Sequence, residues 1–125
     1  MDCQSPRPPK LALDHIAIPV GSLEVSATFY RALGLSDGYA RSDLRQMNGV
    51  DGVVVELLLG GHPGTGHFAL SLDDLPAGLS ELAKRGLRPG GPIRTGATGV
   101  RFVFLTDPDG NRIELVERFP TGNRP

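Results

Sequence analysis

The sequence has no surplus of charge of either sign, no tryptophan and very few aromatic rings. Its 13 basic and 14 acidic side chains give a formal net charge of −1, so the chain lacks the positive field that attracts phosphate backbones. With 5 Phe and 2 Tyr in 125 residues, it also offers few rings on which bases could stack. We therefore expect no nucleic acid among its partners.

Long apolar runs and paired cysteines are missing as well. No uninterrupted apolar stretch approaches the roughly 20 residues that a membrane-spanning helix needs. The polar, proline-rich start MDCQSPRPPK is unlike a secretory signal. The single cysteine, Cys3, cannot form a disulfide within the chain, which is typical of reducing compartments. We expect a soluble cytoplasmic protein with no membrane partner.

The composition changes at both ends of the chain. Residues 1–10 and 120–125 are rich in proline, glycine and polar residues, which bury too little to offset the entropy lost on ordering, so we expect two tails. The part between them, residues 11–119, has the length of one domain with a modest core.

Within this domain a weak internal repeat stands out. The segment HIAIPVGSLEVSATFYRALGL, from His15, aligns without a gap with HFALSLDDLPAGLSELAKRGL, from His67, 52 positions further on. Five positions are identical, among them the two histidines and the glycines Gly34 and Gly86. Because the hydrophobic pattern coincides too, we interpret the repeat as a duplication. It predicts module one at 11–59, a glycine-rich linker at 60–66 and module two at 67–119.

The same pattern predicts the elements of each module. Apolar segments at 11–20 and 67–72 are typical of strands. Apolar residues at three- and four-residue spacing then predict a helix in each half, which Ser22 or Asp74 can cap and which a glycine can end. Further strands are predicted at 44–47, 53–59, 100–105 and 112–117, with a turn at 107–110. Each half thus has a strand, a helix and about three strands, which makes an α+β protein.

Four side chains stand out against these apolar strands. Strand alternation puts His15 and His67 on the faces opposite the helices. Glu56 lies within the run VVVELLL, and Glu114 is two residues into the last strand. A buried unpaired charge costs on the order of several kcal/mol, so Glu56 needs a partner. A duplicated sheet with a pseudo-twofold axis can bring both pairs together.

Two imidazoles and two carboxylates suit a borderline divalent ion such as Zn, Ni, Mn, Fe or Co. We therefore expect one divalent metal ion per site, with His15, Glu56, His67 and Glu114 as ligands. The first pair is 41 residues apart and the second 47. The second half therefore carries a small insertion, which we expect in the loop before residue 100.

Several motifs together resemble the vicinal oxygen chelate superfamily, also called the glyoxalase/bleomycin resistance/dioxygenase superfamily. They are LDHIAI at 13–18, FYRALGL at 29–35, GHFAL at 66–70 and DPDGNRIELVE at 107–117. The resemblance covers essentially residues 11–118 and implies two βαβββ modules that form a curled mixed or antiparallel sheet cup around a metal. It also assigns the four ligand positions to the four residues named above. This ligand set is most like that of glyoxalase I of the bacterial type.

That resemblance implies a metal-dependent lyase or isomerase that abstracts a proton next to a carbonyl and stabilises the resulting enediolate. Glu114 is the first choice for the base, and Glu56 could return the proton on the opposite face. We expect a small-molecule substrate and a homodimer. The sequence leaves open whether a site is completed within one chain or across the dimer.

Other members of the superfamily are alternatives. Methylmalonyl-CoA epimerase is similar but usually has Gln at the position of Glu56. A transferase of the fosfomycin-resistance type would use the ion to activate an epoxide, and a drug-binding resistance protein would need no metal. A dioxygenase ranks lower, because typical extradiol enzymes have a longer, four-module chain.

Three arginines, Arg41, Arg94 and Arg101, are candidates to hold an anionic part of the substrate, and each fits a solvated surface charge at least as well.

Overall fold

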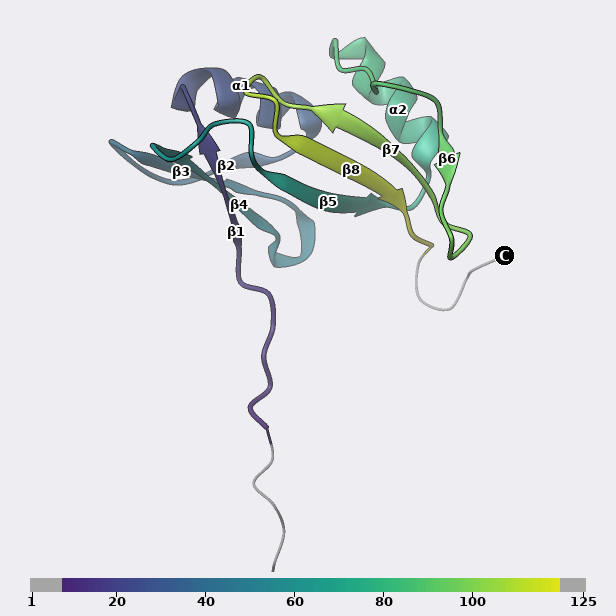
Figure 1. Cartoon of the computed structure of the whole chain (residues 1–125), viewed down its shortest axis with the longest axis horizontal. Helices are drawn as coiled ribbons and strands as arrows, with labels where there is room; N and C mark the ends of the chain where they lie inside the picture. Colours follow the sequence, from purple (N-terminus) through teal and green to yellow (C-terminus); the bar gives the residue numbers. More distant parts are fainter. Residues whose placement is uncertain (1–7, 120–125) are drawn as a thin grey trace, which may run out of the picture.

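The computed structural model describes residues 8–119, which form two modules with the same order of elements (Figure 1). Module one consists of β1 (Ile16–Val20), α1 (Leu23–Leu33), β2 (Ser36–Arg41), β3 (Leu44–Asn48), a 3-10 turn (Val50–Gly52) and β4 (Val54–Leu59). Module two consists of β5 (His67–Leu72), α2 (Leu75–Lys84), β6 (Arg94–Thr95), β7 (Arg101–Thr106) and β8 (Arg112–Glu117).

Each module contains one four-stranded mixed sheet. The strand orders are β1-β4-β3-β2 and β5-β8-β7-β6, so the first strand of each module pairs in parallel with its last strand. Both helices lie on the same side of the molecule, above the two sheets (Figure 1). This architecture confirms the predicted α+β class with two βαβββ modules.

Strand register supports the duplication in detail. In the first sheet Ala17 lies opposite Glu56, and in the second Ala69 lies opposite Glu114. These are the two alanines and the two glutamates that the repeat makes equivalent. The modules therefore match residue by residue where the predicted ligands lie.

The register also locates the insertion in the second half. Gln46 lies opposite one predicted glutamate ligand and Phe104 opposite the other, and these two residues are 58 positions apart. The helix-ending glycines Gly34 and Gly86 are only 52 positions apart. All six extra residues therefore lie between the end of α2 and β7, which confirms the insertion before residue 100.

Both helices begin and end as their sequences predict. The side chains of Ser22 and Asp74 accept hydrogen bonds from the backbone N–H three residues later, at 3.2 and 3.0 Å, which satisfies amides that the helix itself leaves without partners. At the C-terminal ends Gly34 has φ +123° and Gly86 has φ +83°. These are left-handed conformations that side chains other than glycine rarely adopt.

The core lies between the helices and the sheets. One face of each sheet turns toward its helix, and its alternate residues are buried. The buried residues of these faces are Ile18, Val20, Met47, Val55, Leu57, Phe68, Val103, Leu105, Ile113 and Leu115. The opposite face of each sheet is its open face, and the predicted ligands lie on these two open faces.

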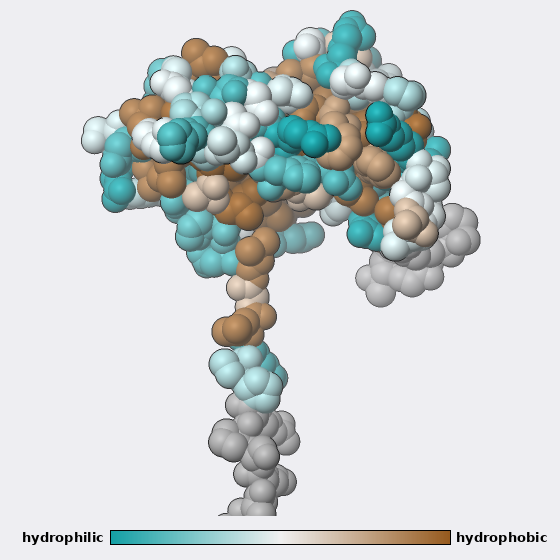
Figure 2. All heavy atoms as spheres, viewed as in Figure 1, coloured by the Kyte–Doolittle hydropathy of each residue, from teal (hydrophilic) through white to brown (hydrophobic). Residues whose placement is uncertain are grey.

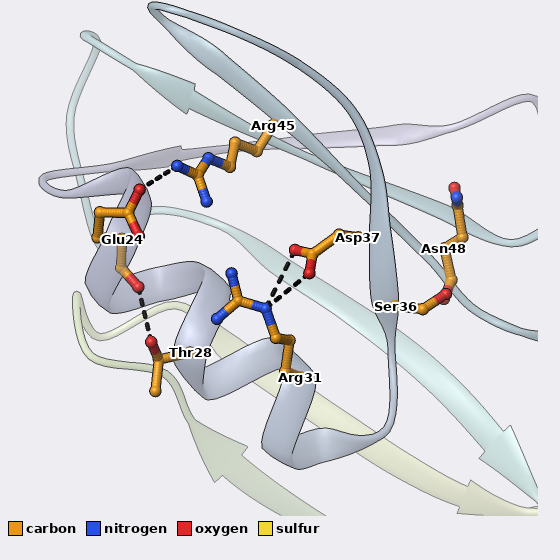
Figure 3. Close-up of polar contacts among 7 residues, drawn as sticks. All are labelled: Glu24, Thr28, Arg31, Ser36, Asp37, Arg45 and Asn48. Atoms are coloured by element: carbon orange, nitrogen blue, oxygen red, sulfur yellow. Dashed lines mark hydrogen bonds and ion pairs between the residues drawn. The ribbon is translucent and has the colours of Figure 1, made fainter.

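Ion pairs tie the outer side of α1 to the strands beside it (Figure 3). The Nε of Arg31 donates to both carboxylate oxygens of Asp37 on β2, at 2.8 and 3.1 Å. Arg45 on β3 pairs with Glu24 on α1. Because these pairs are largely exposed, they orient the helix and contribute little to stability.

The turn between β7 and β8 joins the two modules through a buried hydrogen-bond network. The hydroxyl of Tyr30 on α1 donates to Oδ2 of Asp107 at 2.7 Å, and the side-chain amide of Asn111 donates to the same oxygen at 2.8 Å. That amide also donates to the carbonyl of Pro19 at 3.2 Å. Tyr30, Asp107 and Asn111 are at most 4% exposed. The turn predicted at 107–110 therefore holds module one against module two.

A second set of contacts extends this junction. Asp109 accepts hydrogen bonds from the hydroxyl of Ser26 at 3.2 Å and from the backbone N–H of Gly21 at 3.0 Å. The linker lies against the same turn, since the N–H of Gly66 donates to Oδ1 of Asn111 at 2.6 Å. Together with Tyr30, Asp107, Asn111 and Pro19, these residues form a contact that we call the module junction.

Three elements differ from the sequence-based expectation. The first strand begins at Ile16 rather than at 11, and residues 8–13 extend away from the body (Figures 1 and 2). They have no neighbouring strand in the part of the chain described, and Leu11 and Leu13 are 87% and 83% exposed. The strands β2 and β6 have no apolar alternation, because every one of their residues is exposed.

Residues 1–7 and 120–125 of the two expected tails lie outside the described residues. Neither helix in the described part, with 11 and 10 residues, is long and apolar enough to cross a bilayer.

Candidate metal centre

The first predicted ligand pair, His15 and Glu56, lies together on the open face of module one. Nε2 of His15 is 3.8 Å from Oε1 of Glu56. His15 immediately precedes β1, and the parallel register of β1 with β4 directs both side chains to the same face. The imidazole is 40% exposed and the carboxylate 14%, so the pair is open to solvent on one side.

Each member of this pair is held by another polar side chain. Oδ2 of Asp14 is 2.8 Å from Nδ1 of His15, which leaves Nε2 facing Glu56. The side-chain amide of Gln46 on β3 donates to Oε2 of Glu56 at 2.8 Å, which leaves Oε1 facing the imidazole. Outer partners of this kind orient the ligands of metal sites.

The charges around His15 also change its protonation. The hydrogen bond that the imidazole makes to the Asp14 carboxylate, followed by the negative charge of Glu56, raises the pKa of His15 above its usual value. A divalent ion bound to Nε2 competes with that proton.

The second predicted pair, His67 and Glu114, occupies the equivalent positions in module two. His67 begins β5, and the parallel register of β5 with β8 puts both residues on the open face of their sheet. His67 is exposed and Glu114 is half-buried. The position of Gln46 is taken by Phe104, whose ring centroid is 6.1 Å from that of His67. The second carboxylate therefore lacks the amide that supports the first.

The two pairs do not converge within one chain. In the described range 8–119, no three His, Cys, Asp or Glu side chains lie close enough together to hold one metal ion. The structure brings His15 to Glu56, and it leaves His67 and Glu114 apart from them. A site with all four ligands therefore requires a second copy of the chain or a different arrangement of the two modules.

The chemistry of the first pair fits a divalent ion. Zinc lies about 2.0–2.2 Å from imidazole nitrogen and carboxylate oxygen, so one ion can contact two atoms that are 3.8 Å apart. Two ligands are only half of the usual protein set.

The three arginines suggested by the sequence have different environments. Arg41 pairs with Asp43 at 2.7 Å in an exposed hairpin. Arg101 donates twice to the buried Glu117, at 2.8 Å each, which identifies it as a structural ion pair. Arg94 instead lines a small cavity on the open face of module two.

A larger cavity of about 740 Å³ lies between the modules. Its walls are mostly apolar, with side chains of β1, the 3-10 turn, β5 and α2. Asp14 and His15 also line it, together with Glu81 and Arg85 of α2. The volume falls within the range of small-molecule sites.

Sequence reasoning missed two supporting residues of the centre, Asp14 and Gln46. Asp14 directly precedes a predicted ligand, and this adjacency was a usable signal. Gln46 could have been found only from the register of β3 with β4, which puts it opposite Glu56. Its equivalent in module two is not polar, so the repeat gave no indication.

Comparison with known proteins agrees with this architecture. Residues 36–115 match the family model described as the glyoxalase/bleomycin resistance protein/dioxygenase superfamily. More than half of the chain is matched, and the protein belongs to this superfamily.

Curated relatives carry one recurrent name. A lactoylglutathione lyase of Escherichia coli is 38% identical over 60 residues, which cover 46% of this chain and 43% of that protein. A probable chloroplastic lactoylglutathione lyase of Arabidopsis thaliana is 38% identical over 61 residues, which cover 46% of this chain and 17% of that protein. The chain thus matches less than half the length of these relatives.

Solved structures share the whole fold. A glyoxalase/bleomycin resistance protein of Catenulispora acidiphila is 28% identical with a TM-score of 0.73, covering 87% of this chain and 99% of its own. A bleomycin-binding protein in complex with bleomycin is 18% identical with a TM-score of 0.73, covering 87% of this chain and 99% of its own. The second likeness concerns the fold alone.

Proposed function

We propose that the protein is a metal-dependent enzyme of the glyoxalase type, a lyase or isomerase that moves a proton next to a substrate carbonyl. The observation that carries this proposal is the first ligand pair, in which imidazole and carboxylate face each other at 3.8 Å and each is oriented by a further polar group. A surface ion pair does not require such outer partners, whereas metal ligands commonly have them.

The full site is proposed to form between two copies of the chain. His15 and Glu56 of one copy would face His67 and Glu114 of the other, and the twofold axis would create two such sites. The equivalent registers of the two glutamates support this arrangement, because both pairs present the same donors on open faces. The separation of the pairs within one chain supports it too.

The metal would supply Lewis-acid stabilisation of negative charge on two neighbouring substrate oxygens. The side chains of the protein would move the proton. Glu114 would accept a proton from the carbon next to the carbonyl, and Glu56 in its protonated form would deliver a proton from the opposite face. Proton exchange with solvent would then restore both carboxyl groups. Gln46 would hold Glu56 in place during this transfer through its amide.

The names of the curated relatives suggest a hemithioacetal as the substrate. Its isomerisation to a thioester transfers one proton between neighbouring carbons and needs no oxidant. The chain is short between Gly34 and Glu56, where larger members of the superfamily build substrate-contacting loops. Glutathione and a smaller thiol are therefore both tested.

The test has two parts. Purified untagged protein should contain about one divalent ion per chain, measured by elemental analysis. In deuterated water it should convert a hemithioacetal, formed from an α-ketoaldehyde and glutathione or 2-mercaptoethanol, to a thioester that carries deuterium on the carbon next to its carbonyl. E114Q should abolish this conversion and leave the circular dichroism spectrum unchanged. A metal-free protein that cannot be loaded with Zn, Ni, Mn, Fe or Co would refute the proposal.

A drug-binding protein is the second candidate, and one observation favours it. The apolar cavity of about 740 Å³ between the modules is large enough for an organic ligand. In that case bleomycin or a similar compound would bind with the same affinity in the presence of a chelator. Metal-independent binding together with no proton exchange would favour this candidate over the enzyme.

A further inference from the structure

From the side chains that line the smaller cavity, we infer that the open face of module two carries a binding subsite for an oxyanion, formed by Arg94 and Arg112 beside the ring of Phe104. The assignment of this subsite to the substrate rests on the proposed function. The subsite itself rests on the geometry of the described residues.

Strand register puts the three side chains on one face. Arg94 on β6 lies opposite Phe102, so it shares a face with the alternate residue Phe104 on β7. Arg112 on β8 lies opposite Thr106 and directly beside His67 on β5. The same open face therefore carries two guanidinium groups, an aromatic ring and the second predicted ligand pair.

A cavity of about 250 Å³ lies among these groups. Its wall consists of Gly90, Gly91, Pro92, Arg94, Val103, Phe104, Thr106 and Arg112. It contains two cationic side chains and no acidic one. The volume suits a carboxylate or phosphate group with a few attached carbons.

One of the two arginines is already held in place. The guanidinium carbon of Arg112 lies 4.1 Å from the centroid of the Phe104 ring, which is the geometry of a cation–π contact. This contact occupies one face of the guanidinium and leaves its N–H groups available in the plane. A planar fork of donors of this kind binds carboxylate and phosphate oxygens in pairs.

Neither arginine of the cavity is neutralised by the protein. Arg31, Arg41, Arg45 and Arg101 all pair with carboxylates. Within residues 8–119, Arg94 and Arg112 have no carboxylate oxygen within 4.0 Å. Arg88 has none either, but it does not line this cavity. Two unpaired positive charges that share one cavity favour a negatively charged ligand.

The position of the cavity defines a substrate class. Phe104, whose side chain lines the cavity, lies opposite Glu114 in the sheet, and its ring is near the imidazole of His67. A substrate whose reacting carbon is close to Glu114 would therefore extend its remote end toward Arg94 and Arg112. We infer that this end carries a carboxylate or phosphate, so an acidic substrate is favoured over a neutral adduct of the same size.

The test uses binding of simple probes in the presence of a chelator, so that it does not depend on the metal centre. Phenylacetate and phenyl phosphate are titrated against the full chain and followed by amide chemical shifts, with phenylacetamide as the neutral probe of the same shape. The anions should shift the amides of Gly90, Gly91 and Arg94, and phenylacetamide should not.

The variants R94Q and R112Q should each weaken binding of the anions by about tenfold, the loss expected for one charge-assisted contact. R88Q removes the same charge outside the cavity and is the matched control, with an expected change below about twofold. F104L should weaken binding less than R112Q does, since it removes the contact that holds one arginine and no charge.

Phenylacetate and phenyl phosphate together distinguish the two oxyanions. Binding of either one supports the subsite, and the tighter of the two identifies its chemistry. Equal binding of phenylacetate and phenylacetamide, or equal losses in R88Q and R94Q, would overturn the subsite. Anion binding in a protein that cannot be loaded with metal would uphold the subsite and refute the proposed enzyme.

Discussion

The hydroxyl of Tyr30 provides the sharpest test of how the two modules are joined. It is fully buried on α1, and its only role in the module junction is to donate a 2.7 Å hydrogen bond to the carboxylate of Asp107 in module two. Tyr30→Phe removes this donor and keeps the ring and its contacts with Phe29 and Phe68. The variant therefore isolates one bond between the modules.

The magnitude follows from the type of bond. Hydrogen bonds to charged groups contribute about 1.5–3 kcal/mol. The loss should lie near the lower limit, ~1.5–2 kcal/mol, because Oδ2 of Asp107 keeps its bond from the amide of Asn111. For a chain of this length such a loss lowers the melting temperature by roughly 5–10 °C.

The assay is thermal and urea unfolding followed by circular dichroism, with Tyr39→Phe as the control. Tyr39, the only other tyrosine, is 60% exposed, so removal of its hydroxyl should change the free energy of unfolding by less than about 0.5 kcal/mol. If both variants melt within 1 °C of the unmodified protein, the buried hydrogen bond does not stabilise the junction and the reasoning fails. If the Tyr30→Phe variant unfolds in two separate transitions where the parent unfolds in one, the hydrogen bond also couples the unfolding of the two modules.

Three further predictions concern single residues. Gln46→Leu should weaken divalent metal binding by about 10–100-fold through loss of the amide that orients Glu56; a metal titration checks this, and unchanged affinity would count against the supporting role. The two bonds from Arg101 and the backbone N–H at the start of α2 hold the pKa of Glu117 below its ordinary value of 4.5, so this carboxylate stabilises the fold above that pH, and the contribution is lost as the pH falls through the lowered pKa. Below pH 4.5 the free energy of unfolding should therefore fall less steeply with decreasing pH in E117Q than in the parent. Parallel curves for the two proteins would contradict the assignment. Gly64→Ala should destabilise the linker strongly, because its Cβ would lie 2.4 Å from a backbone carbonyl oxygen of the β7–β8 turn at φ +88°; an unchanged melting temperature would show that the linker is not fixed there.

Much of the fold followed from the sequence because the signals were local. The two caps, the glycines after the helices and the apolar strands all depend on neighbours within a few residues, and 67–72 and 112–117 coincide with β5 and β8. The duplication added information that local patterns lack, because the elements recognised in one module predicted the equivalent elements of the other.

The elements that were missed have a physical reason in common. The strand β2, with the sequence SDGYAR, is exposed along its whole length and lies at a sheet edge, so it has no apolar face to reveal it. The first strand was predicted too long, because the apolar residues Leu11 and Leu13 resembled strand residues. In the described part of the chain no strand pairs with them. Alternation of apolar and polar residues indicates that one face of a strand is buried, but it does not indicate whether a neighbouring strand is present.

The candidate site shows the same limit at longer range. Strand alternation in the sequence put His15 on the face opposite the helix, and the parallel pairing of β1 with β4 brings Glu56 to within 3.8 Å of it. How the two sheets are placed relative to each other depends on tertiary packing, which no local pattern contains. That is why the convergence of all four ligands stays a prediction.

The most direct test of the central claim is metal binding by a mixed dimer. One chain carries H15A and E56Q, the other carries H67A and E114Q, and the heterodimer is isolated by two different affinity tags. Neither variant alone should retain the ion. If each site takes one pair from each copy, the heterodimer keeps one intact site of two and should bind about half the metal of the unmodified dimer. A heterodimer that is folded and binds no metal, beside an unmodified dimer that does, would contradict the shared site.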